Sequence, residues 1–310
     1  MRVLVSGGAG FIGSSIVDAY LIAGHEVAII DSFVTGQRQN VLAGIRVYET
    51  DIRDVDRVRQ AVDEFRPEVL NHHAAHLSVS ESVVDPRYDA DVNTIGFLTL
   101  MEAARPYLKR VIVASSGGVV YGDAGQIPTP ESHPTQPISP YGVAKLTMEH
   151  YLHYYEVQYQ LTWVALRYAN VYGPRQNPKG ETGVVAVFLD QLGLGKQPQI
   201  LGDGLQTRDY VFIGDVVRAN VQALTHGQGA YNIGTGTETT VIEIFTQLQA
   251  AYGSSLPQMH GPARDGEQRR SALDATKAHA ELAWQPTVGL RGGLQQTVAW
   301  YQALGGSHGK

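Results

Sequence analysis

The sequence contains no cysteine, no long apolar run and no cluster of basic residues. The missing cysteines exclude disulfides, thiolate catalysis and cysteine-ligated zinc or iron–sulfur centres. No apolar stretch approaches the roughly 20 residues of a membrane-spanning helix. The short apolar run at residues 1–5 is broken by Ser6 and Gly7, which predicts a buried strand rather than a signal peptide. Scattered Lys and Arg, with a formal net charge of −6, argue against binding to nucleic acid or an anionic membrane. We therefore expect a cytoplasmic protein.

Short apolar runs alternate with helix-like segments along the first half of the 310 residues. This alternation predicts an α/β fold, a Rossmann doubly wound parallel sheet with helices on both faces. The expected strands are 2–6, 26–30, 45–48, 69–72, 110–114 and 161–167, and the expected helices are 11–23, 55–65, 89–107 and 141–159.

The pattern loosens after Tyr168 into helical segments separated by loops that contain glycine and proline. A strand at 209–213 and the helix after Gly214 are expected to return to the sheet. We therefore expect a sheet domain of residues 1–168 plus about 209–236. Residues 169–208 and 237–310 are expected to form a smaller, mostly α C-terminal subdomain.

Residues 6–13, SGGAGFIG, directly follow the first expected strand and open the first expected helix. In this context Gly7 permits a tight turn, Gly10 lets a pyrophosphate approach the backbone, and Gly13 lets the helix pack on the strand. The N–H groups at the start of the helix can bind the phosphates. The stretch therefore predicts a dinucleotide site.

Asp31 ends the second expected strand, where a carboxylate can accept hydrogen bonds from the adenosine ribose. A carboxylate repels a 2′-phosphate, so the sequence favours NAD over NADP. A solvated turn aspartate is the alternative for Asp31. Asp51, after the third strand, could meet the adenine edge.

Tyr141 and Lys145 stand four residues apart and therefore share one face of the helix that follows Ser139-Pro140. A free phenol has a pKa near ~10 and is a poor base at neutral pH. A neighbouring ammonium and a positive nicotinamide ring favour the phenolate by direct attraction. We expect Tyr141 to be the acid/base and Lys145 to lower its pKa and hold the nicotinamide ribose.

A third catalytic group is expected from ASSGGVVYG, residues 114–122, where the fifth expected strand ends. A hydroxyl there would face the nicotinamide and orient the reacting hydroxyl or shuttle its proton. Ser116 is the first candidate and Ser115 the second, while a simple role in the turn stays open for both.

These segments, together with LRYANVYGPRQ at 166–176, resemble the extended short-chain dehydrogenase/reductase superfamily. Within it, the sequence is most similar to NAD-dependent epimerases and dehydratases of the UDP-glucose 4-epimerase type, from Met1 to about Val298. The resemblance implies an isomerase that binds NAD in the sheet domain and a UDP-sugar in the C-terminal subdomain.

The motifs and the resemblance together give a set of expected site residues. The expected NAD-binding residues are Gly7, Gly10, Phe11, Ile12, Gly13, Asp31, Ser32, Gly36, Asp51, Ile52, Ala74, Ala75, His76, Asn93, Ser115, Tyr141, Lys145, Tyr168 and Val171. The expected substrate-binding residues are Ser116, Asn170, Val184, Val185, Gln199, Ile200, Arg208, Arg264, Glu267 and Ser271. Arg208 and Arg264 match arginines that grip the UDP phosphates in the family, and Glu267 matches the acidic residue on the uridine ribose.

The sequence departs from the family pattern at two places. Many relatives place the catalytic hydroxyl four residues before the tyrosine that here is Tyr121, and that position is Gly117. Ser116 must then serve, or the backbone must shift. Many relatives also carry lysine or glutamine in the cofactor loop where this chain has His76-Leu77.

Gly117 and Gly118 also bear on the reaction. The dehydratase branch has an acidic pair there, and two glycines cannot do acid/base work. Net reduction usually uses NADPH, which Asp31 disfavours. The remaining reaction is reversible oxidation at C4 through a transient 4-keto sugar. A small residue at Ser271 predicts tolerance of an N-acetylhexosamine, and a UDP-glucuronate 4-epimerase stays open.

His72, His73 and His76 could suggest a metal site, but adjacent strand residues face opposite ways and no carboxylate has the spacing of a zinc protease, so we expect no metal. A non-catalytic dinucleotide sensor on the same fold is the rival from another class. Such sensors typically lose the Tyr-x-x-x-Lys pair, which is present here.

The tyrosines at 151, 154, 155 and 159 follow Tyr141 on its helix. They could stack on bases, but packing against the sheet or a second subunit fits an amphipathic helix better. By the resemblance, the helices at 89–107 and 141–159 form a homodimer interface.

Overall fold

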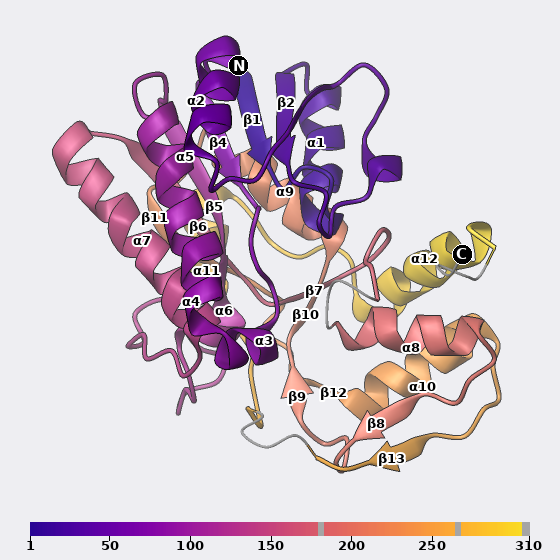
Figure 1. The fold of residues 1–310 in the computed structure, drawn as a ribbon. Helices are drawn as coiled ribbons and strands as arrows, with labels where there is room; N and C mark the ends of the chain where they lie inside the picture. The colour runs from indigo at the N-terminus through magenta and orange to yellow at the C-terminus, as the bar shows by residue number, and fades with distance from the viewer. Residues whose placement is uncertain (179–182, 264–267, 306–310) are drawn as a thin grey trace.

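The computed structural model describes residues 1–178, 183–263 and 268–305. Its largest feature is a seven-stranded sheet in the order β11-β6-β5-β4-β1-β2-β3, in which every neighbouring pair is parallel (Figure 1). The strands of this sheet are β1 (Arg2–Ser6), β2 (Glu26–Asp31), β3 (Arg46–Glu49), β4 (Val69–His72), β5 (Arg110–Ser116), β6 (Thr162–Tyr168) and β11 (Gly229–Ile233). The predicted α/β fold with a Rossmann doubly wound sheet is confirmed.

Helices cover both faces of the sheet because successive strand residues point to opposite sides. Val3 and Val5 pack with α1 (Phe11–Ile22) and α9 (Ile213–Ala223), while Leu4 packs with the helices of the other face. Those helices are α2 (Val55–Phe65), α5 (Gly96–Ala104) and α7 (Pro140–Tyr159), which lie together on the left in Figure 1. The nearly continuous burial of β1, β2, β4 and β6 follows from this double cover, whereas the edge strand β3 is mostly exposed.

The expected single helix at 89–107 is wrong in detail. The chain instead forms α4 (Pro86–Ala90), one wide π turn, η2 (Asp91–Ile95), and then α5. The side chain of Asn93, inside the wide turn, bonds back to the backbone of His76. Such single π turns often mark functional sites. Two short helices, α3 (Val79–Val84) and α6 (Gly117–Val120), carry no expectation from the sequence.

The expected return to the sheet at 209–213 is also wrong. β10 (Tyr210–Phe212) pairs with β7 (Asn170–Tyr172) in a separate two-stranded sheet, and β11 takes the edge of the main sheet. An apolar run predicts a strand but does not say which strand it pairs with.

A smaller lobe lies below the sheet in Figure 1. It contains the two-stranded sheets β8 (Gln199–Leu201) with β13 (Met259–Gly261) and β9 (Thr207–Arg208) with β12 (Thr239–Thr240). Its helices α8 (Val184–Gly193) and α12 (Leu290–Ala303) pack with α10 (Val241–Tyr252). The remaining elements are η1 (Arg38–Asn40) and α11 (Thr276–Leu282), which packs on β11. In the part of the chain described here, no helix combines the length and the apolar character needed to cross a membrane.

Candidate active site

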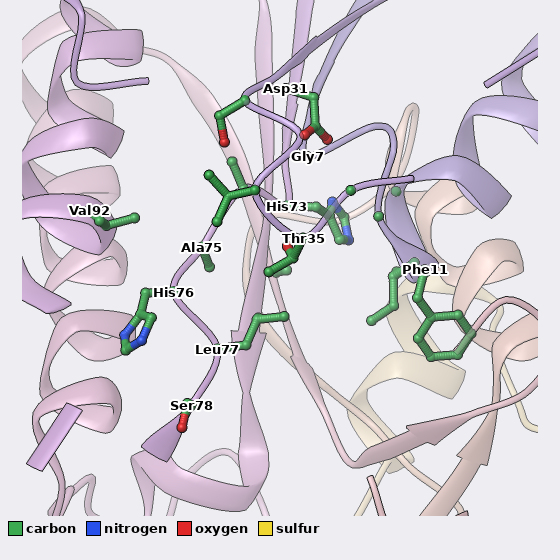
Figure 2. A pocket seen from close by; sticks show the side chains of 18 of the residues that line it. Gly7, Phe11, Asp31, Thr35, His73, Ala75, His76, Leu77, Ser78 and Val92 are labelled. Carbon is green, nitrogen blue, oxygen red and sulfur yellow. The ribbon is translucent and has the colours of Figure 1, made fainter. Parts of the chain in front are cut away.

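A cavity of about 500 Å³ opens where the parallel strands end, which is where α/β sheets bind ligands. In Figure 2 the loop Ala75–Ser78 forms one side of the cavity, Phe11 lies across from it, and Asp31 lies near the top. The predicted residues that line it are Gly7, Gly10, Phe11, Ile12, Gly13, Asp31, Ser32, Gly36, Asp51, Ile52, Ala74, Ala75, His76, Ser115, Ser116, Tyr141, Lys145, Tyr168 and Val171.

The glycines at 7, 10 and 13 differ in the structural reason for which each position needs a residue without a side chain. Gly7 has φ +69°, and a Cβ there would lie 2.7 Å from the backbone nitrogen of Ala74. A Cβ on Gly13 would collide with the carbonyl of Gly7. A Cβ on Gly10 would meet only the Gly7 carbonyl oxygen, at 3.2 Å. This contact is tight, but a shift of a few tenths of an ångström would relieve it, so the fold constrains Gly10 less than Gly7 or Gly13. Its bare backbone suits the close approach of a pyrophosphate.

Asp31 sits at the end of β2 with both carboxylate oxygens held by the backbone. Ala9 N donates to Oδ2 at 2.9 Å and Phe33 N donates to Oδ1 at 2.8 Å. A Cβ on Gly36 would lie 2.7 Å from Oδ1. The loop that contains Gly36 can therefore pass this close to the carboxylate only because position 36 is a glycine. Burial raises the pKa of Asp31, although these two hydrogen bonds oppose the shift. The carboxylate therefore has a fixed direction at the cavity and keeps lone pairs for ribose hydroxyls.

Tyr141 and Lys145 lie one turn apart at the start of α7, as predicted. Ser139 caps the helix by accepting a hydrogen bond from Gly142 N at 3.1 Å, and Pro140 occupies the first turn. Lys145 Nζ donates to the carbonyl of Ala114 at 2.9 Å and lies 5.5 Å from the centre of the Tyr141 ring. Burial lowers the pKa of Lys145 to about 8, against the attraction of Asp89. The pair is thus a phenol beside a buried amine.

Ser115 and Ser116 both line the cavity, but their surroundings differ. Ser115 is buried and its hydroxyl donates to Glu149 Oε1 at 2.5 Å. That carboxylate also forms an ion pair with Arg167 at 2.6 Å. The Ser115 hydroxyl is therefore committed to a structural contact, which favours Ser116 as the hydroxyl that serves the site.

Gly117 has a packing reason that the sequence does not reveal. A Cβ at this position would collide with the side chain of Leu273, from the segment just before α11. In this chain a leucine thus fills the space that a serine or threonine side chain at 117 would need. The glycine at this position is therefore explained by packing.

Some predicted residues do not line the cavity. Asn93 is fully buried behind the loop and supports it through His76. The other predicted residues that the structure places away from the cavity are Asn170, Val184, Val185, Gln199, Ile200, Arg208 and Ser271. They lie on or beside β7, α8, β8 and β9 and just before α11. Arg264 and Glu267 lie outside the described residues.

Several cavity residues were not predicted as cofactor or substrate ligands. Asn40 donates to the carbonyl of Ala9 at 3.1 Å and so fixes the glycine turn, although it ends the short helix η1, for which the sequence shows no pattern. Arg175 pairs with Asp18 of α1 at 2.7 Å and has a left-handed φ of +73°. The sequence could have pointed to Arg175, because it lies in the motif at 166–176 that carries the resemblance to the family. Strained residues of this kind concentrate at functional sites.

The neighbouring histidines at the end of β4 are bound to different partners. His72 Nδ1 lies 2.7 Å from Ser6 Oγ, and His73 Nε2 lies 3.0 Å from the Tyr168 hydroxyl. Burial, and then Lys145, lower the pKa of His73 to about 3, so its ring is neutral at neutral pH. Among the described residues, no three His, Asp or Glu side chains are grouped as metal ligands.

The donor set fits a dinucleotide. The glycine turn and the first N–H groups of α1 suit phosphates, Asp31 suits ribose hydroxyls, and Tyr141 and Lys145 lie where β5 ends.

Comparison with known proteins gives the same result. Residues 3–234 match the NAD dependent epimerase/dehydratase family. The chain is 44% identical over 311 residues to UDP-glucose 4-epimerase of Mycolicibacterium smegmatis, covering 97% of this chain and 99% of that protein. The structure of Thermotoga maritima UDP-glucose 4-epimerase with UDP-glucose superposes with a TM-score of 0.96 at 43% identity, over 98% of this chain and 99% of that one. Thermus thermophilus UDP-glucose 4-epimerase in complex with NAD gives a TM-score of 0.93 at 43% identity, over 97% and 99%. This chain therefore belongs to the NAD dependent epimerase/dehydratase family.

Proposed function

We propose that this protein is an isomerase that inverts C4 of a UDP-hexose, interconverting UDP-glucose and UDP-galactose with NAD as cofactor. The observation that carries the proposal is that Tyr141, Lys145 and Ser116 line the same cavity as the glycine turn and Asp31. The similar proteins of M. smegmatis, T. maritima and T. thermophilus, each named UDP-glucose 4-epimerase, support the same assignment.

The reaction needs a base, a cation and an oriented hydroxyl from the protein. The chemistry that bound NAD supplies is the acceptance of a hydride from C4 and its return. Tyr141, as the phenolate, takes the proton of the 4-hydroxyl as the 4-keto sugar forms and gives it back to the ketone oxygen. The Lys145 ammonium favours the phenolate, and the Ser116 hydroxyl orients the reacting oxygen.

We assign UDP-sugar binding to the lobe of residues 169–208 and 237–310, and NAD binding to residues 1–168 with about 209–236. Asn170 begins β7 and is exposed, and half-buried Arg208 lies in β9, opposite Thr239 of β12. An arginine and an amide are suitable donors for a diphosphate. The other side chains assigned to the UDP-sugar are Val184, Val185, Gln199, Ile200, Arg264, Glu267 and Ser271.

The sugar specificity is assigned through Ser271. This serine is buried and lies two residues before Leu273, whose side chain packs against Gly117 beside Ser116. A small side chain here leaves room for a 2-acetamido group, so we propose that UDP-N-acetylglucosamine is also turned over. Turnover of UDP-glucose with none of UDP-N-acetylglucosamine would contradict this assignment.

The test is an assay of C4 inversion on UDP-glucose, UDP-N-acetylglucosamine and UDP-glucuronate without added NAD. We expect inversion of UDP-glucose, and loss of about a hundredfold to ten-thousandfold in turnover for Tyr141→Phe, because general acid–base catalysis commonly contributes ~10²–10⁴-fold. Tyr141→Phe should still contain NAD. A protein that binds NAD but inverts no UDP-hexose would instead be a dinucleotide sensor.

We also propose that the protein is a homodimer. Val143, Tyr151 and Val157 form an exposed apolar stripe along α7, and exposed Ile95 adds to it from the adjoining η2. Exposed apolar surface of this kind is typical of an interface.

A further inference from the structure

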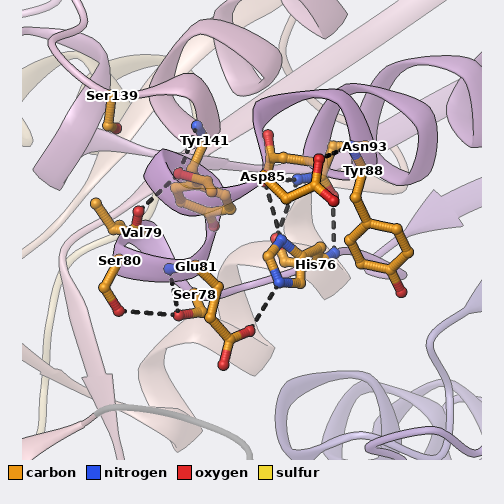
Figure 3. Close-up of polar contacts among 12 residues, drawn as sticks. His76, Ser78, Val79, Ser80, Glu81, Asp85, Tyr88, Asn93, Ser139 and Tyr141 are labelled. Atoms are coloured by element: carbon orange, nitrogen blue, oxygen red, sulfur yellow. Dashed lines mark hydrogen bonds and ion pairs between the residues drawn. The ribbon is translucent and has the colours of Figure 1, made fainter.

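His76 lies in the loop between β4 and α3, on the wall of the cofactor cavity. Its backbone is clamped by one side chain: His76 N donates to Asn93 Oδ1 at 2.8 Å, and Asn93 Nδ2 donates to the His76 carbonyl at 3.0 Å. Figure 3 shows the imidazole beside Asn93 with Glu81 on its other side. The backbone of His76 is therefore held in one place, which limits the positions that its ring can take.

Each ring nitrogen of His76 faces a carboxylate oxygen. Nδ1 lies 3.1 Å from Asp89 Oδ1, and Nε2 lies 3.0 Å from Glu81 Oε2. A neutral imidazole can donate from only one nitrogen, and an ionised carboxylate can only accept. With neutral His76, one of the two contacts would set lone pair against lone pair. With both carboxylates ionised, the geometry therefore favours the doubly protonated imidazolium.

The buried partner makes this charge important. The side chain of Asp89 is 1% exposed and receives a second hydrogen bond from Asn93 Nδ2 at 2.9 Å. A buried carboxylate needs a nearby cation, and His76 is in direct contact with it. Burial lowers the pKa of His76, but the hydrogen bonds to Glu81 and Asp89 outweigh it, so that the pKa lies above its ordinary value. The pKa agrees with the geometry.

The contact extends to the catalytic pair through α3. Glu81 and Ser82 are neighbours on α3, and Ser82 Oγ accepts a hydrogen bond from Tyr141 N at 3.3 Å. That N–H lies in the first turn of α7, where the helix itself supplies no acceptor. On the other side, Asp89 attracts the ammonium of Lys145. The two carboxylates that His76 joins thus connect to Tyr141 and Lys145.

We propose that His76 is a positioning residue for the epimerase: as an imidazolium it joins Glu81 of α3 to Asp89 of α4, and so holds the cofactor loop and the first turn of α7 in the geometry that retains NAD. The inference rests on the proposed function, because it assumes that the cavity binds NAD. His76 itself transfers no proton in the reaction.

Few other ionisable groups reach this cluster. Tyr88 of α4 packs edge-on against the imidazole at 5.3 Å between ring centres, and Arg53 lies over the Tyr88 ring. Arg53 is itself paired with Asp51 and with Asp91 of η2. Lys145 of α7 also attracts Asp89, and this attraction is still present when His76 loses its proton.

The direction of the pH dependence follows from the raised pKa. A histidine whose pKa is higher in the folded chain than its unfolded value near 6.5 stabilises the fold fully below that value. The contribution disappears as the pH rises through the folded-state pKa. NAD should therefore be held most firmly on the acid side of this transition.

The first test is independent of function. Nitrogen-15 NMR of the imidazoles, with His76 assigned by its loss in His76→Gln, should show both nitrogens protonated at pH 6 and a titration above pH 6.5. A neutral ring at pH 6 overturns the proposal. A chain that binds no NAD would contradict the proposed function, and this spectrum would still decide the state of His76.

The second test measures the rate of NAD release from the loaded protein between pH 6 and 9. Losing a hydrogen bond to a charged group commonly changes an equilibrium or a rate by about tenfold. Neutral His76→Gln should release NAD about tenfold faster than the unsubstituted protein at pH 6 and at an equal rate at pH 9. His76→Lys, which keeps a cation, should stay slow throughout. His226→Gln, at an exposed histidine, is the control and should behave as the unsubstituted protein. The proposal is overturned if the ratio of the NAD release rates of His76→Gln and the unsubstituted protein does not change with pH. Fast NAD release from His76→Lys also overturns it.

Discussion

At the scale of single residues, close contacts separate glycines that the fold needs from glycines that a ligand needs. Gly7 and Gly13 are surrounded by backbone atoms that a Cβ would strike. Gly10 sits between them in the same turn, yet a Cβ there would have only one close neighbour, at 3.2 Å. We infer that Gly10 is a glycine because of the bound pyrophosphate.

We therefore predict that Gly10→Ala folds normally and loses NAD. The added methyl group would stand where the phosphate approaches the backbone, so NAD affinity should fall by at least about tenfold, equivalent to ~1.4 kcal/mol. The NAD content of the purified protein and its binding isotherm measure this, and circular dichroism checks the fold. Gly125→Ala is the matched control, because a Cβ there meets nothing within 4 Å. An alanine variant that retains NAD as the control does would contradict this reading of the turn.

The proposed catalytic serine shows what a residue pattern leaves undecided. The sequence offered Ser115 and Ser116 as neighbouring candidates, and their difference lies in Glu149, which is distant along the chain and takes the Ser115 hydroxyl. Gly117 is explained in the same way by Leu273, far away in sequence. Contacts of this kind depend on the packed fold, whereas Tyr141 and Lys145 share one helix and could be paired from spacing alone.

At the scale of elements, strands and helices with a strong period were predictable and their interruptions were not. The expected strand at 2–6 and helix at 55–65 match β1 and α2 residue for residue. The prediction of one helix at 89–107 was wrong because the hydrophobic period of the sequence continues through η2, where the structure has a wide turn around Asn93. That turn is held by a side-chain contact with His76, which hydrophobic periodicity does not register.

A buried ion pair holds α7, the helix that carries Tyr141 and Lys145, against the sheet. Glu149 of α7 and Arg167 of β6 lie 2.6 Å apart with side chains 6% and 7% exposed. Removing one charge leaves the other buried and uncompensated, which commonly costs ~3–5 kcal/mol. We predict that Glu149→Gln and Arg167→Met each lower the free energy of unfolding by about 3 kcal/mol, and that the double variant recovers at least half of the larger loss.

Urea unfolding at a fixed NAD concentration measures the four proteins of this cycle. Asp203→Asn provides the control, since it breaks the Arg269–Asp203 pair, whose side chains are 59% and 50% exposed. An exposed pair contributes ~1 kcal/mol or less. If the double variant is less stable than the unsubstituted protein by the sum of the two single losses, the pair does not act as a unit.

At the scale of the whole molecule, the helices on one face of the sheet leave apolar side chains exposed on their outer side. The inner faces of α5 and α7 fill the core through Leu100, Met148 and Leu152. On the outer side of α7, Val157 is 62% exposed. Figure 1 shows α7 at the outer edge of the molecule, away from α1. A second copy related by a two-fold axis would cover this face with the same helices.

We predict that the protein sediments as a dimer of twice the 33.7 kDa chain and that Val157→Asp sediments as a monomer. A carboxylate at the centre of an apolar interface must be desolvated when the copies associate, and the two-fold axis would bury it twice. Ile22→Asp is the matched control: Ile22 is 88% exposed at the end of α1, on the opposite side of the sheet, and its substitution should leave the dimer intact. Sedimentation velocity over a range of concentrations distinguishes the three proteins, and circular dichroism confirms that the monomer is folded. If the unsubstituted chain is a monomer at every concentration, or if both aspartate variants dissociate alike, the stripe on α7 is not the interface.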